Sequence, residues 1–234
     1  MHQFKLPQAA IDRSIANRGV AHPFGVLDPA KTALLVIDMQ NYFVAPGAQG
    51  EIPMAREVVP SINRLAQAMR AAKSNVIWVQ NSTNGTRESW SVMANHLMTP
   101  ARAAHRWAAM AEGAEGFKLW PALDAKPDDF YIIKKRFSAF IQGSSNIEAF
   151  CRARGIDTLL IAGTASNGCC ESTARDATML NFKVAMISDA SATDTDELHS
   201  VSMRFFYQVY GDVLTVDEAI AGLVASAPER LRSA

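Results

Sequence analysis

The sequence is poor in features that would place it in several other classes of protein. Its 234 residues include only three cysteines, too few for the disulfide framework of a small secreted domain. Lysine plus arginine and aspartate plus glutamate each number 23, so no charge excess points to nucleic acid or to an acidic tail. No apolar run approaches the ~20 residues of a membrane span, and the first residues lack the pattern of a secretory signal. We therefore expect a cytoplasmic protein without a nucleic-acid or membrane partner.

Cofactor motifs are also scarce. The five histidines show no metal-ligand spacing; they are His2, His22, His96, His105 and His199. A dinucleotide site would require a Gly-x-Gly-x-x-Gly turn after the first strand, but residues 38–41, which follow that strand, contain no glycine. We therefore expect neither a bound metal nor another cofactor.

What the sequence does contain is enough apolar material for one substantial core. Hydrophobic residues make up 49% of the chain, and a chain of this length folds by default as one domain. Residues 1–30 show no clear periodicity, so we interpret them as an N-terminal arm that packs on the domain or on a second subunit. Residues 31–234 are predicted to form a single domain.

Within this domain, short apolar runs alternate with helix-forming segments. The first run, residues 33–38, is almost continuously apolar, which implies burial on both faces, as in a parallel sheet with helices on each side. The alternation predicts an α/β fold. The expected strands are 33–38, 75–80, 130–133, 157–162, 183–189 and 213–215, and the expected helices are 54–72, 100–110, 146–154, 171–182 and 197–210. Pro60 lies inside the first of these helices and predicts a kink there or a later start.

The segment 163–177 contains the strongest chemical signal. It follows a buried strand and reads as a turn with glycines, then a helix whose first turn carries Cys169 and Cys170. The unpaired N–H groups and positive partial charge of a helix N-terminus favour a thiolate and can hold an anionic oxygen beside it. The alternative interpretation is that both cysteines are small, buried apolar residues.

Asp38, Lys134 and Cys169 each follow a different predicted strand. Ligand sites of parallel sheets lie at the carboxyl ends of the strands, so we expect these three side chains on adjacent loops. Taken singly, each has a structural explanation, because Asp often caps a loop, Lys is usually solvated and Cys is usually core. Together they supply a base, a cation and a nucleophile, which is the set that covalent acyl transfer requires.

Three motifs in register resemble the isochorismatase-like cysteine hydrolases. They are Leu-Val-Ile-Asp-Met-Gln-Asn at 35–41, Lys134 followed six residues later by Phe140, and the segment 163–177. Three motifs in the family's order are far more specific than any one of them, and the resemblance runs from about residue 30 to residue 220. The resemblance implies a three-layer αβα, Rossmann-like fold with a six-stranded parallel sheet.

The resemblance also implies an Asp-Lys-Cys triad, which maps by motif position to Asp38, Lys134 and Cys169. The spacing argues against the neighbours Lys135 and Cys170. In the implied mechanism, the sulfur attacks an amide-type carbonyl and forms a thioester. Lysine favours the thiolate, while aspartate carries the thiol proton to the departing amine and then activates water.

The resemblance places two further features in the turn before the nucleophile. The oxyanion donors are expected to be the backbone N–H groups of Ala165 and Cys169. A cis peptide bond without proline is expected between Thr164 and Ala165.

Two branches of the family fit this sequence poorly. The nicotinamidase branch carries an Asp-x-His metal motif after the second strand, but residues 80–86 contain no histidine. True isochorismatases have no cysteine at the nucleophile position, where this chain has Cys169. The remaining branch hydrolyses small amide, carbamoyl or ureido compounds. We therefore predict a metal-independent cysteine amidohydrolase with a small-molecule amide or ureido substrate.

Residues 78–81, Trp-Val-Gln-Asn, resemble a segment with which the ureido-hydrolysing branch binds its substrate through an asparagine. Asn81 is therefore a candidate substrate-binding residue, because a carboxamide can both donate to and accept from a ureido group. The alternative is that Asn81 merely starts a turn.

Other hypotheses remain open at this point. The chain could be a catalytically silent small-molecule binding or oligomerisation module on the same fold, or a hydrolase of the nicotinamidase or isochorismatase type. We expect a homodimer or homotetramer, with the arm or the tryptophan-containing stretch 81–128 at the interface. That stretch is long and irregular enough to cover a pocket.

Overall fold

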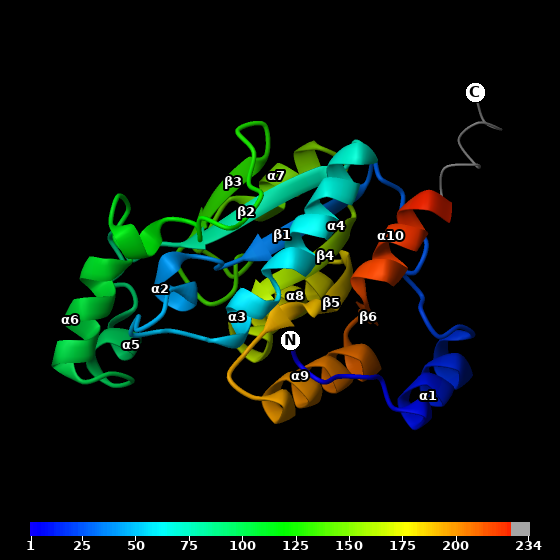
Figure 1. Ribbon diagram of the computed structural model, residues 1–234, viewed down its shortest axis with the longest axis horizontal. Helices are drawn as coiled ribbons and strands as arrows, with labels where there is room; N and C mark the ends of the chain where they lie inside the picture. The colour runs from blue at the N-terminus through cyan, green and yellow to red at the C-terminus, as the bar shows by residue number, and fades with distance from the viewer. Residues whose placement is uncertain (226–234) are drawn as a thin grey trace.

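The computed structural model describes residues 1–225, which form three layers around a parallel sheet (Figure 1). The sheet has the spatial order β3-β2-β1-β4-β5-β6, and every neighbouring pair is parallel. Its strands are β1 (Thr32–Ile37), β2 (Asn75–Asn81), β3 (Phe130–Lys134), β4 (Thr158–Thr164), β5 (Lys183–Ala192) and β6 (Asp212–Leu214). The predicted α/β fold with a six-stranded parallel sheet is confirmed. Residues 226–234 of the predicted domain lie outside the described residues.

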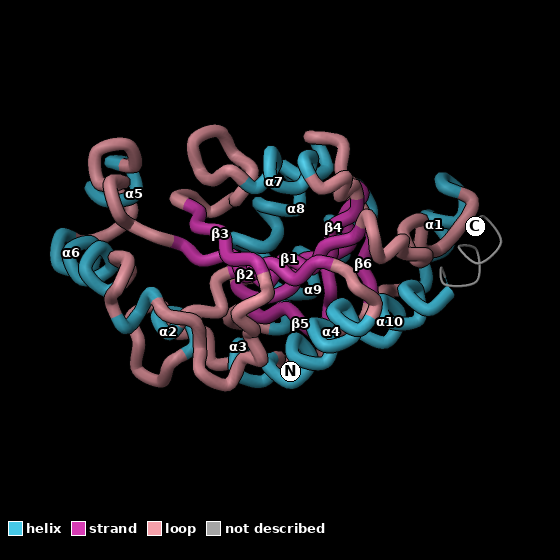
Figure 2. Tube along the Cα trace, turned by 90° about the horizontal axis from the view of Figure 1, so that it is seen from above, coloured by secondary structure: helices cyan, strands magenta, loops and turns pink. Residues whose placement is uncertain are grey.

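The central strands are buried on both faces, as the apolar runs predict. All six residues of β1 are buried, and alternate side chains enter two separate cores, with Leu34 in one and Leu35 in the other. Helices α4 (Val59–Ala71) and α10 (Val216–Ala225) pack on the first core. Helices α7 (Ile147–Ala153), α8 (Glu171–Met179) and α9 (Asp196–Val209) pack on the second. Figure 2 shows α4 and α10 on one side of the sheet, with α7 and α8 on the other.

The helix expected over 54–72 is two helices. A short α3 (Met54–Glu57) is followed at once by α4 (Val59–Ala71), and Val58 separates them. Pro60 lies in the first turn of α4, where a missing N–H breaks no intrahelical hydrogen bond. The later start predicted from Pro60 is therefore correct for α4.

The N-terminal arm contains a helix that its sequence pattern does not predict. This helix, α1 (Gln8–Arg18), buries only Ala10 and Ser14, and two small residues make no detectable apolar stripe. The arm packs on its own domain, since the Tyr207 hydroxyl of α9 donates a hydrogen bond to the Ala21 carbonyl at 2.6 Å. The arm is thus held in place by the edge of the sheet that carries β6.

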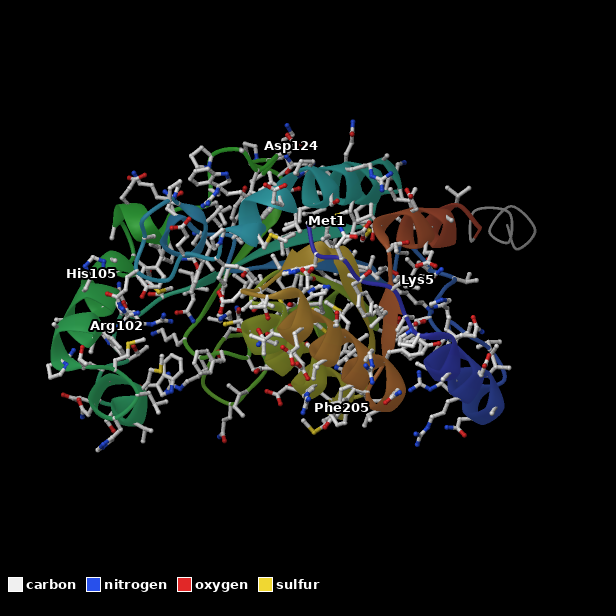
Figure 3. The ribbon with its side chains drawn as sticks, turned by 60° about the horizontal axis from the view of Figure 1, so that its bottom comes forward. Met1, Lys5, Arg102, His105, Asp124 and Phe205 are labelled. Atoms are coloured by element: carbon white, nitrogen blue, oxygen red, sulfur yellow. The ribbon has the colours of Figure 1, made fainter. Side chains whose placement is uncertain are left out.

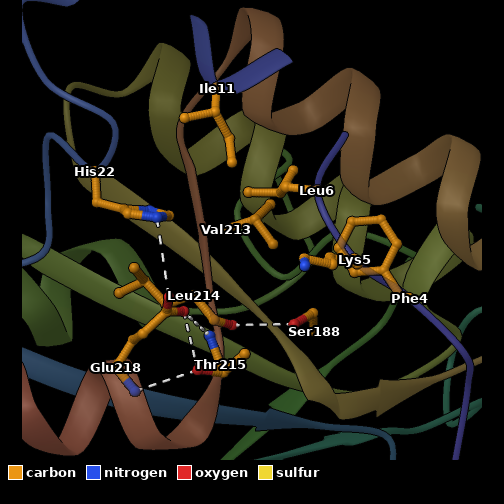
Figure 4. A pocket seen from close by; sticks show the side chains of 10 residues that line it. All are labelled: Phe4, Lys5, Leu6, Ile11, His22, Ser188, Val213, Leu214, Thr215 and Glu218. Carbon is orange, nitrogen blue, oxygen red and sulfur yellow. Dashed lines mark hydrogen bonds and ion pairs between the residues drawn. The ribbon is translucent and has the colours of Figure 1, made fainter. Parts of the chain in front are cut away.

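A cavity of about 260 Å³ lies between the arm, β6 and α10, and Figure 4 shows its lining. The arm contributes Phe4, Lys5 and Leu6, while the Ser188 hydroxyl of β5 donates to the Leu214 carbonyl at 3.3 Å. This cavity lies at the β6 edge of the sheet. Helices α5 (Ser91–Asn95) and α6 (Pro100–Ala109) lie at the opposite end of the molecule (Figure 1).

The stretch 81–128 returns to the sheet beside the carboxyl end of β1. After α6 and the short η1 (Glu115–Phe117), the Trp120 N–H donates to the Met39 carbonyl at 2.9 Å. The N–H of Asn41, the first residue of α2 (Asn41–Val44), donates in turn to the Lys118 carbonyl at 2.9 Å. The stretch therefore covers the end of β1. Over residues 1–225, no helix is both long and apolar enough to cross a membrane.

Candidate active site

The carboxyl ends of β1 and β3 bring Asp38 and Lys134 together. Asp38 follows β1 with a φ of 53°, a left-handed conformation that Asp tolerates better than most residues. Lys134 is the last residue of β3, and both residues are 0% exposed. Lys134 Nζ lies 2.9 Å from Asp38 Oδ2. Because each charge is removed from water, each depends on the other for compensation.

The carbonyl of Arg136 orients two side chains of the site. It accepts a hydrogen bond from Lys134 Nζ at 2.9 Å and one from Asn81 Nδ2 at 3.1 Å. The contact of Lys134 with Asp38 is close in distance, but neither carboxylate oxygen accepts a hydrogen bond of good geometry from the described residues. The carboxylate oxygens therefore retain the capacity to accept a proton or a substrate N–H.

The nucleophile candidate lies on a turn between β4 and α8. Cys169 belongs to η2 (Ser166–Cys170), a short turn kinked at Gly168, whose φ of −121° and ψ of −105° are not helical. The turn leads directly into α8, and Cys169 is 8% exposed. The pKa of its thiol is raised to about 12, first by burial and then by the Asp38 carboxylate, while Lys134 and Arg106 act in the opposite direction. Lys134 and Arg106 thus favour the thiolate, whereas burial and the Asp38 carboxylate favour the protonated thiol.

The ammonium of Lys134 is held in its charged form. Burial lowers its pKa, but Asp38 and Cys169 raise it by more, and the net direction is upward. Cys170, by contrast, is fully buried and its sulfur contacts the Ala162 carbonyl of β4 at 3.8 Å. The two adjacent cysteines thus differ in their surroundings, because the Cys170 thiol lies against a backbone carbonyl of β4.

The turn before Cys169 has a tightly determined backbone. Gly163 has a φ of 111°, and a Cβ added there would lie 2.1 Å from the Ile37 carbonyl oxygen, so only glycine fits. The peptide between Thr164 and Ala165 is cis, as the family resemblance implies. The Ala165 carbonyl accepts hydrogen bonds from the N–H groups of Gly168 and Cys170 at 3.0 and 3.1 Å. The two expected oxyanion donors, Ala165 and Cys169, stand at opposite ends of this turn.

Helix α9 supports the turn through contacts that the sequence gives no signal for. The Ser202 hydroxyl donates to the Ser166 carbonyl at 3.2 Å and to Glu171 Oε2 at 2.6 Å. Ser166 Oγ also lies 3.0 Å from Nδ1 of the buried His199. Arg175 pairs with Glu171 inside α8, its Nε lying 2.9 Å from Oε1. The Ser202 hydroxyl thus joins η2 to Glu171, the first residue of α8.

Asn81 is buried at the end of β2 and faces inward. Its backbone N–H donates to Gln40 Oε1 at 2.7 Å, and its side-chain amide nitrogen is engaged by Arg136. Its Oδ1 has no hydrogen-bond partner among the described residues. The alternative that Asn81 merely starts a turn does not account for this inward-facing acceptor.

Residues 80–86, which lack the histidine motif expected of the nicotinamidase branch, include side chains that hydrogen-bond within the protein. Gln80 Nε2 donates to the Phe117 carbonyl at 2.9 Å, and Ser82 Oγ donates to Glu112 Oε1 at 2.9 Å. In the part of the chain that the structure describes, no three His, Cys, Asp or Glu side chains gather in a way that could hold a metal ion.

Arg106 is a third charged residue that acts on the Cys169 thiol, beside Asp38 and Lys134, and the sequence gives no signal for it. Arg106, on α6, is 6% exposed and its guanidinium lies 5.2 Å from the ring centre of Tyr42. Nothing in the local pattern distinguishes it from the exposed Arg102 one turn earlier. Only the packing of α6 against α2 identifies it.

The fold is a three-layer α/β fold with an all-parallel sheet, and Asp38, Lys134 and Cys169 lie at the carboxyl edge of that sheet. The sequence profile of the isochorismatase domain matches residues 32–218. The chain belongs to the isochorismatase family and is a hydrolase.

Two curated relatives differ in what their names say. A ureidoacrylate amidohydrolase from Caulobacter vibrioides is 33% identical over 70% of this chain and 78% of its own length. A protein from Arabidopsis thaliana named a probable inactive nicotinamidase is 32% identical over 74% of this chain and 86% of its own length.

Solved structures agree with the fold. A cysteine hydrolase from Pseudomonas syringae superposes with a TM-score of 0.73 at 25% identity, covering 86% of this chain and 95% of that one. An N-carbamoylsarcosine amidase from Thermoplasma acidophilum gives a TM-score of 0.62 at 25% identity, covering 80% and 97%.

Proposed function

We propose that this chain is a metal-independent cysteine amidohydrolase that cleaves the C–N bond of a small amide, carbamoyl or ureido compound through a thioester. The observation that carries the proposal is the buried pair of Asp38 and Lys134, 2.9 Å apart and both close enough to Cys169 to shift its pKa. The names of two relatives, ureidoacrylate amidohydrolase and N-carbamoylsarcosine amidase, support C–N bond cleavage and a carbamoyl-type substrate.

In the acylation step, the Asp38 carboxylate accepts the thiol proton while the sulfur of Cys169 bonds to the substrate carbonyl carbon. Because the resting thiol has a pKa of about 12, little thiolate accumulates before attack, and the proton leaves as the S–C bond forms. The carbonyl oxygen becomes an oxyanion and accepts hydrogen bonds from the N–H groups of Ala165 and Cys169.

The tetrahedral intermediate then collapses. Asp38 gives its proton to the substrate nitrogen, the C–N bond breaks, and ammonia or an amine leaves. Water attacks the thioester carbon while Asp38 accepts a proton from it; the S–C bond breaks and the sulfur of Cys169 regains a proton. Asn81 Oδ1, which accepts no hydrogen bond from the described residues, accepts an N–H of the substrate in this proposal.

The test is an ammonia-release screen over ureido acids, carbamoyl amino acids, biuret-like compounds and simple amides. We expect turnover by the parent protein, none by Cys169→Ser, and most of the parent rate in the matched neighbour Cys170→Ser. Intact mass spectrometry of the parent with a substrate should detect the acyl-enzyme. If Cys170→Ser is inactive while folded and Cys169→Ser is active, the nucleophile is wrongly assigned.

One alternative has a specific observation behind it. Because one relative is named a probable inactive nicotinamidase, the chain could bind a small molecule without hydrolysing it. If a compound of the screen raises the melting temperature of the parent without ammonia release or a covalent adduct, the chain is better described as a catalytically silent binding module.

A second alternative is a metal-dependent enzyme of the nicotinamidase type. We expect activity to be retained after exhaustive chelation, which would argue against that alternative.

A further inference from the structure

Arg106 occupies a buried position between two elements that cover the carboxyl edge of the sheet. It lies on α6, the helix that carries the labelled Arg102 and His105 in Figure 3. Its guanidinium carbon stands 5.2 Å from the ring centre of Tyr42 and 5.8 Å from that of Phe43. Both rings belong to α2, which begins three residues after Asp38. Arg106 therefore packs against the helix that follows the proposed base, Asp38.

Among the described residues, this buried cation has no anionic partner. Over residues 1–225, no carboxylate lies within ion-pair distance of the Arg106 guanidinium, and its buried Nε donates no hydrogen bond. Two other cations show the usual arrangement, since Lys134 pairs with Asp38 and Arg175 with Glu171. Removing an unpaired charge from water is costly, and the aromatic rings offset only part of that cost. An anion supplied by a ligand would complete the site.

Arg106 also acts electrostatically on the thiol of Cys169. Its positive charge lowers the pKa of the Cys169 thiol, against the larger effects of burial and Asp38. Tyr42 and Phe43, against which Arg106 packs, follow Asp38 closely in the chain, so an anion held by Arg106 would lie on the side of the site that carries the proposed base.

The unpartnered polar atoms of the site divide into two kinds. Near the proposed base they are acceptors: both carboxylate oxygens of Asp38 and Oδ1 of Asn81. These suit the N–H groups of an amide or carbamoyl function. Arg106 offers the opposite chemistry, a planar set of donors that matches a carboxylate in a bidentate manner.

We propose that Arg106 binds the carboxylate of the substrate and thereby selects carbamoyl or amide derivatives of acids over uncharged amides. This inference rests on the proposed hydrolase function and adds a specificity-determining residue to it. A simple neutral amide would satisfy Asp38 and Asn81 but would leave the buried guanidinium without an anion.

The first test does not require turnover. Cys169 is alkylated in parallel with iodoacetate and iodoacetamide, and with 3-bromopropionate and 3-bromopropionamide, and the acid-to-amide rate ratio is measured. Arg106→Gln should lower this ratio by about 10- to 100-fold for the better-fitting pair, the range expected for one charged hydrogen-bonded contact. Arg106→Lys should restore part of it. Arg102→Gln, on the same helix but exposed, should leave it unchanged.

A second measurement uses the parent protein alone, so it does not depend on whether a variant folds. Succinate should slow the alkylation of Cys169 by iodoacetamide, whereas succinamide at the same concentration should not. Equal protection by the two compounds would overturn the proposal, as would an acid-to-amide ratio that Arg106→Gln leaves unaltered.

Kinetics separate this inference from the proposed function. For a hydrolysed carbamoyl acid, Arg106→Gln should raise KM and lower kcat/KM far more than for the matching neutral amide. If the parent hydrolyses nothing but its alkylation ratio depends on Arg106, the hydrolase proposal fails and the anion site stands. If neutral and acidic compounds are hydrolysed equally well by parent and variant, the hydrolase stands and the anion site fails.

Discussion

Lys134 Nζ lies 2.9 Å from Asp38 Oδ2, and neither residue has measurable exposure to solvent. The two residues come from β3 and from the end of β1, which are separated in the sheet by β2. Such a pair contributes little net stability when intact, but losing one partner leaves a buried charge without compensation, which typically costs about 3–5 kcal/mol. The pair is therefore better suited to holding charge at one point than to stabilising the fold.

Asp38→Asn keeps the shape and polarity of the side chain but cannot accept the thiol proton. We expect turnover to fall about 10²- to 10⁴-fold, the usual effect of losing a general base. The measurement is the steady-state rate on whichever substrate the screen identifies, with circular dichroism to verify the fold. Normal turnover in this variant would show that Asp38 is not the proton carrier.

Lys134→Ala removes the cation that opposes the rise in the Cys169 thiol pKa. Alkylation of Cys169 by iodoacetamide at neutral pH should slow, and the protein should unfold at a lower denaturant concentration because Asp38 is left unpaired. Lys135→Ala is the matched control. The backbone N–H of Lys135 donates to the Ser144 carbonyl at 3.0 Å, a bond that alanine retains. Identical behaviour of the two variants would contradict the assignment of Lys134.

His199 gives the stability of the protein a dependence on acid pH. Burial, and then the neighbouring His2, lower its pKa to about 4, and Asp196 opposes them only in part. Between about pH 6.5 and pH 4 the unfolded chain binds a proton that the folded chain does not, so stability falls as pH falls through this window.

The expected loss from His199 is about 2–3 kcal/mol at pH 4 relative to pH 7. Unfolding midpoints of the parent and His199→Gln across this range measure it, and the variant should lose less stability on acidification. His105→Gln, an exposed position on α6, should follow the parent. Parallel pH profiles for the parent and His199→Gln would show that His199 is not responsible.

Assembly into a homodimer or homotetramer stays a prediction. Several large apolar side chains are exposed, among them Phe137, Ile141 and Met179 at 41%, 49% and 68%. All three line an open hollow of about 470 Å³ that Arg136 and Arg175 also border. Light scattering at micromolar concentration should give a multiple of 25.4 kDa; a single-chain mass would contradict the prediction.

The sheet could be predicted from the sequence for one physical reason, and the three candidate site residues at its carboxyl edge for another. Strands such as β1 are buried on both faces, so their apolar runs are nearly uninterrupted and easy to recognise. Asp38, Lys134 and Cys169 could be placed together because parallel strands end at a common edge and because three motifs matched the family in register.

Features that depend on packing could not be predicted in this way. The elevated thiol pKa of Cys169 arises mainly from burial, which no local pattern encodes. Arg106 acquires its role only where α6 meets α2, and α1 buries too few residues to leave a periodic signal. The hydroxyl of Ser202 contacts the turn that carries Cys169 from a helix that follows this turn in sequence.

The close approach of Gly163 to the Ile37 carbonyl has a consequence for redesigning this protein. Because a Cβ at residue 163 would lie 2.1 Å from that oxygen, the backbones of β1 and β4 are in direct contact next to Asp38 and just before the turn that carries Cys169. The proposed base and nucleophile thus share one rigid support, whereas Arg106 comes from a separate segment, 81–128. If Arg106 binds the substrate as proposed, substitutions in α6 will change which compounds are accepted without altering the backbone contact between β1 and β4.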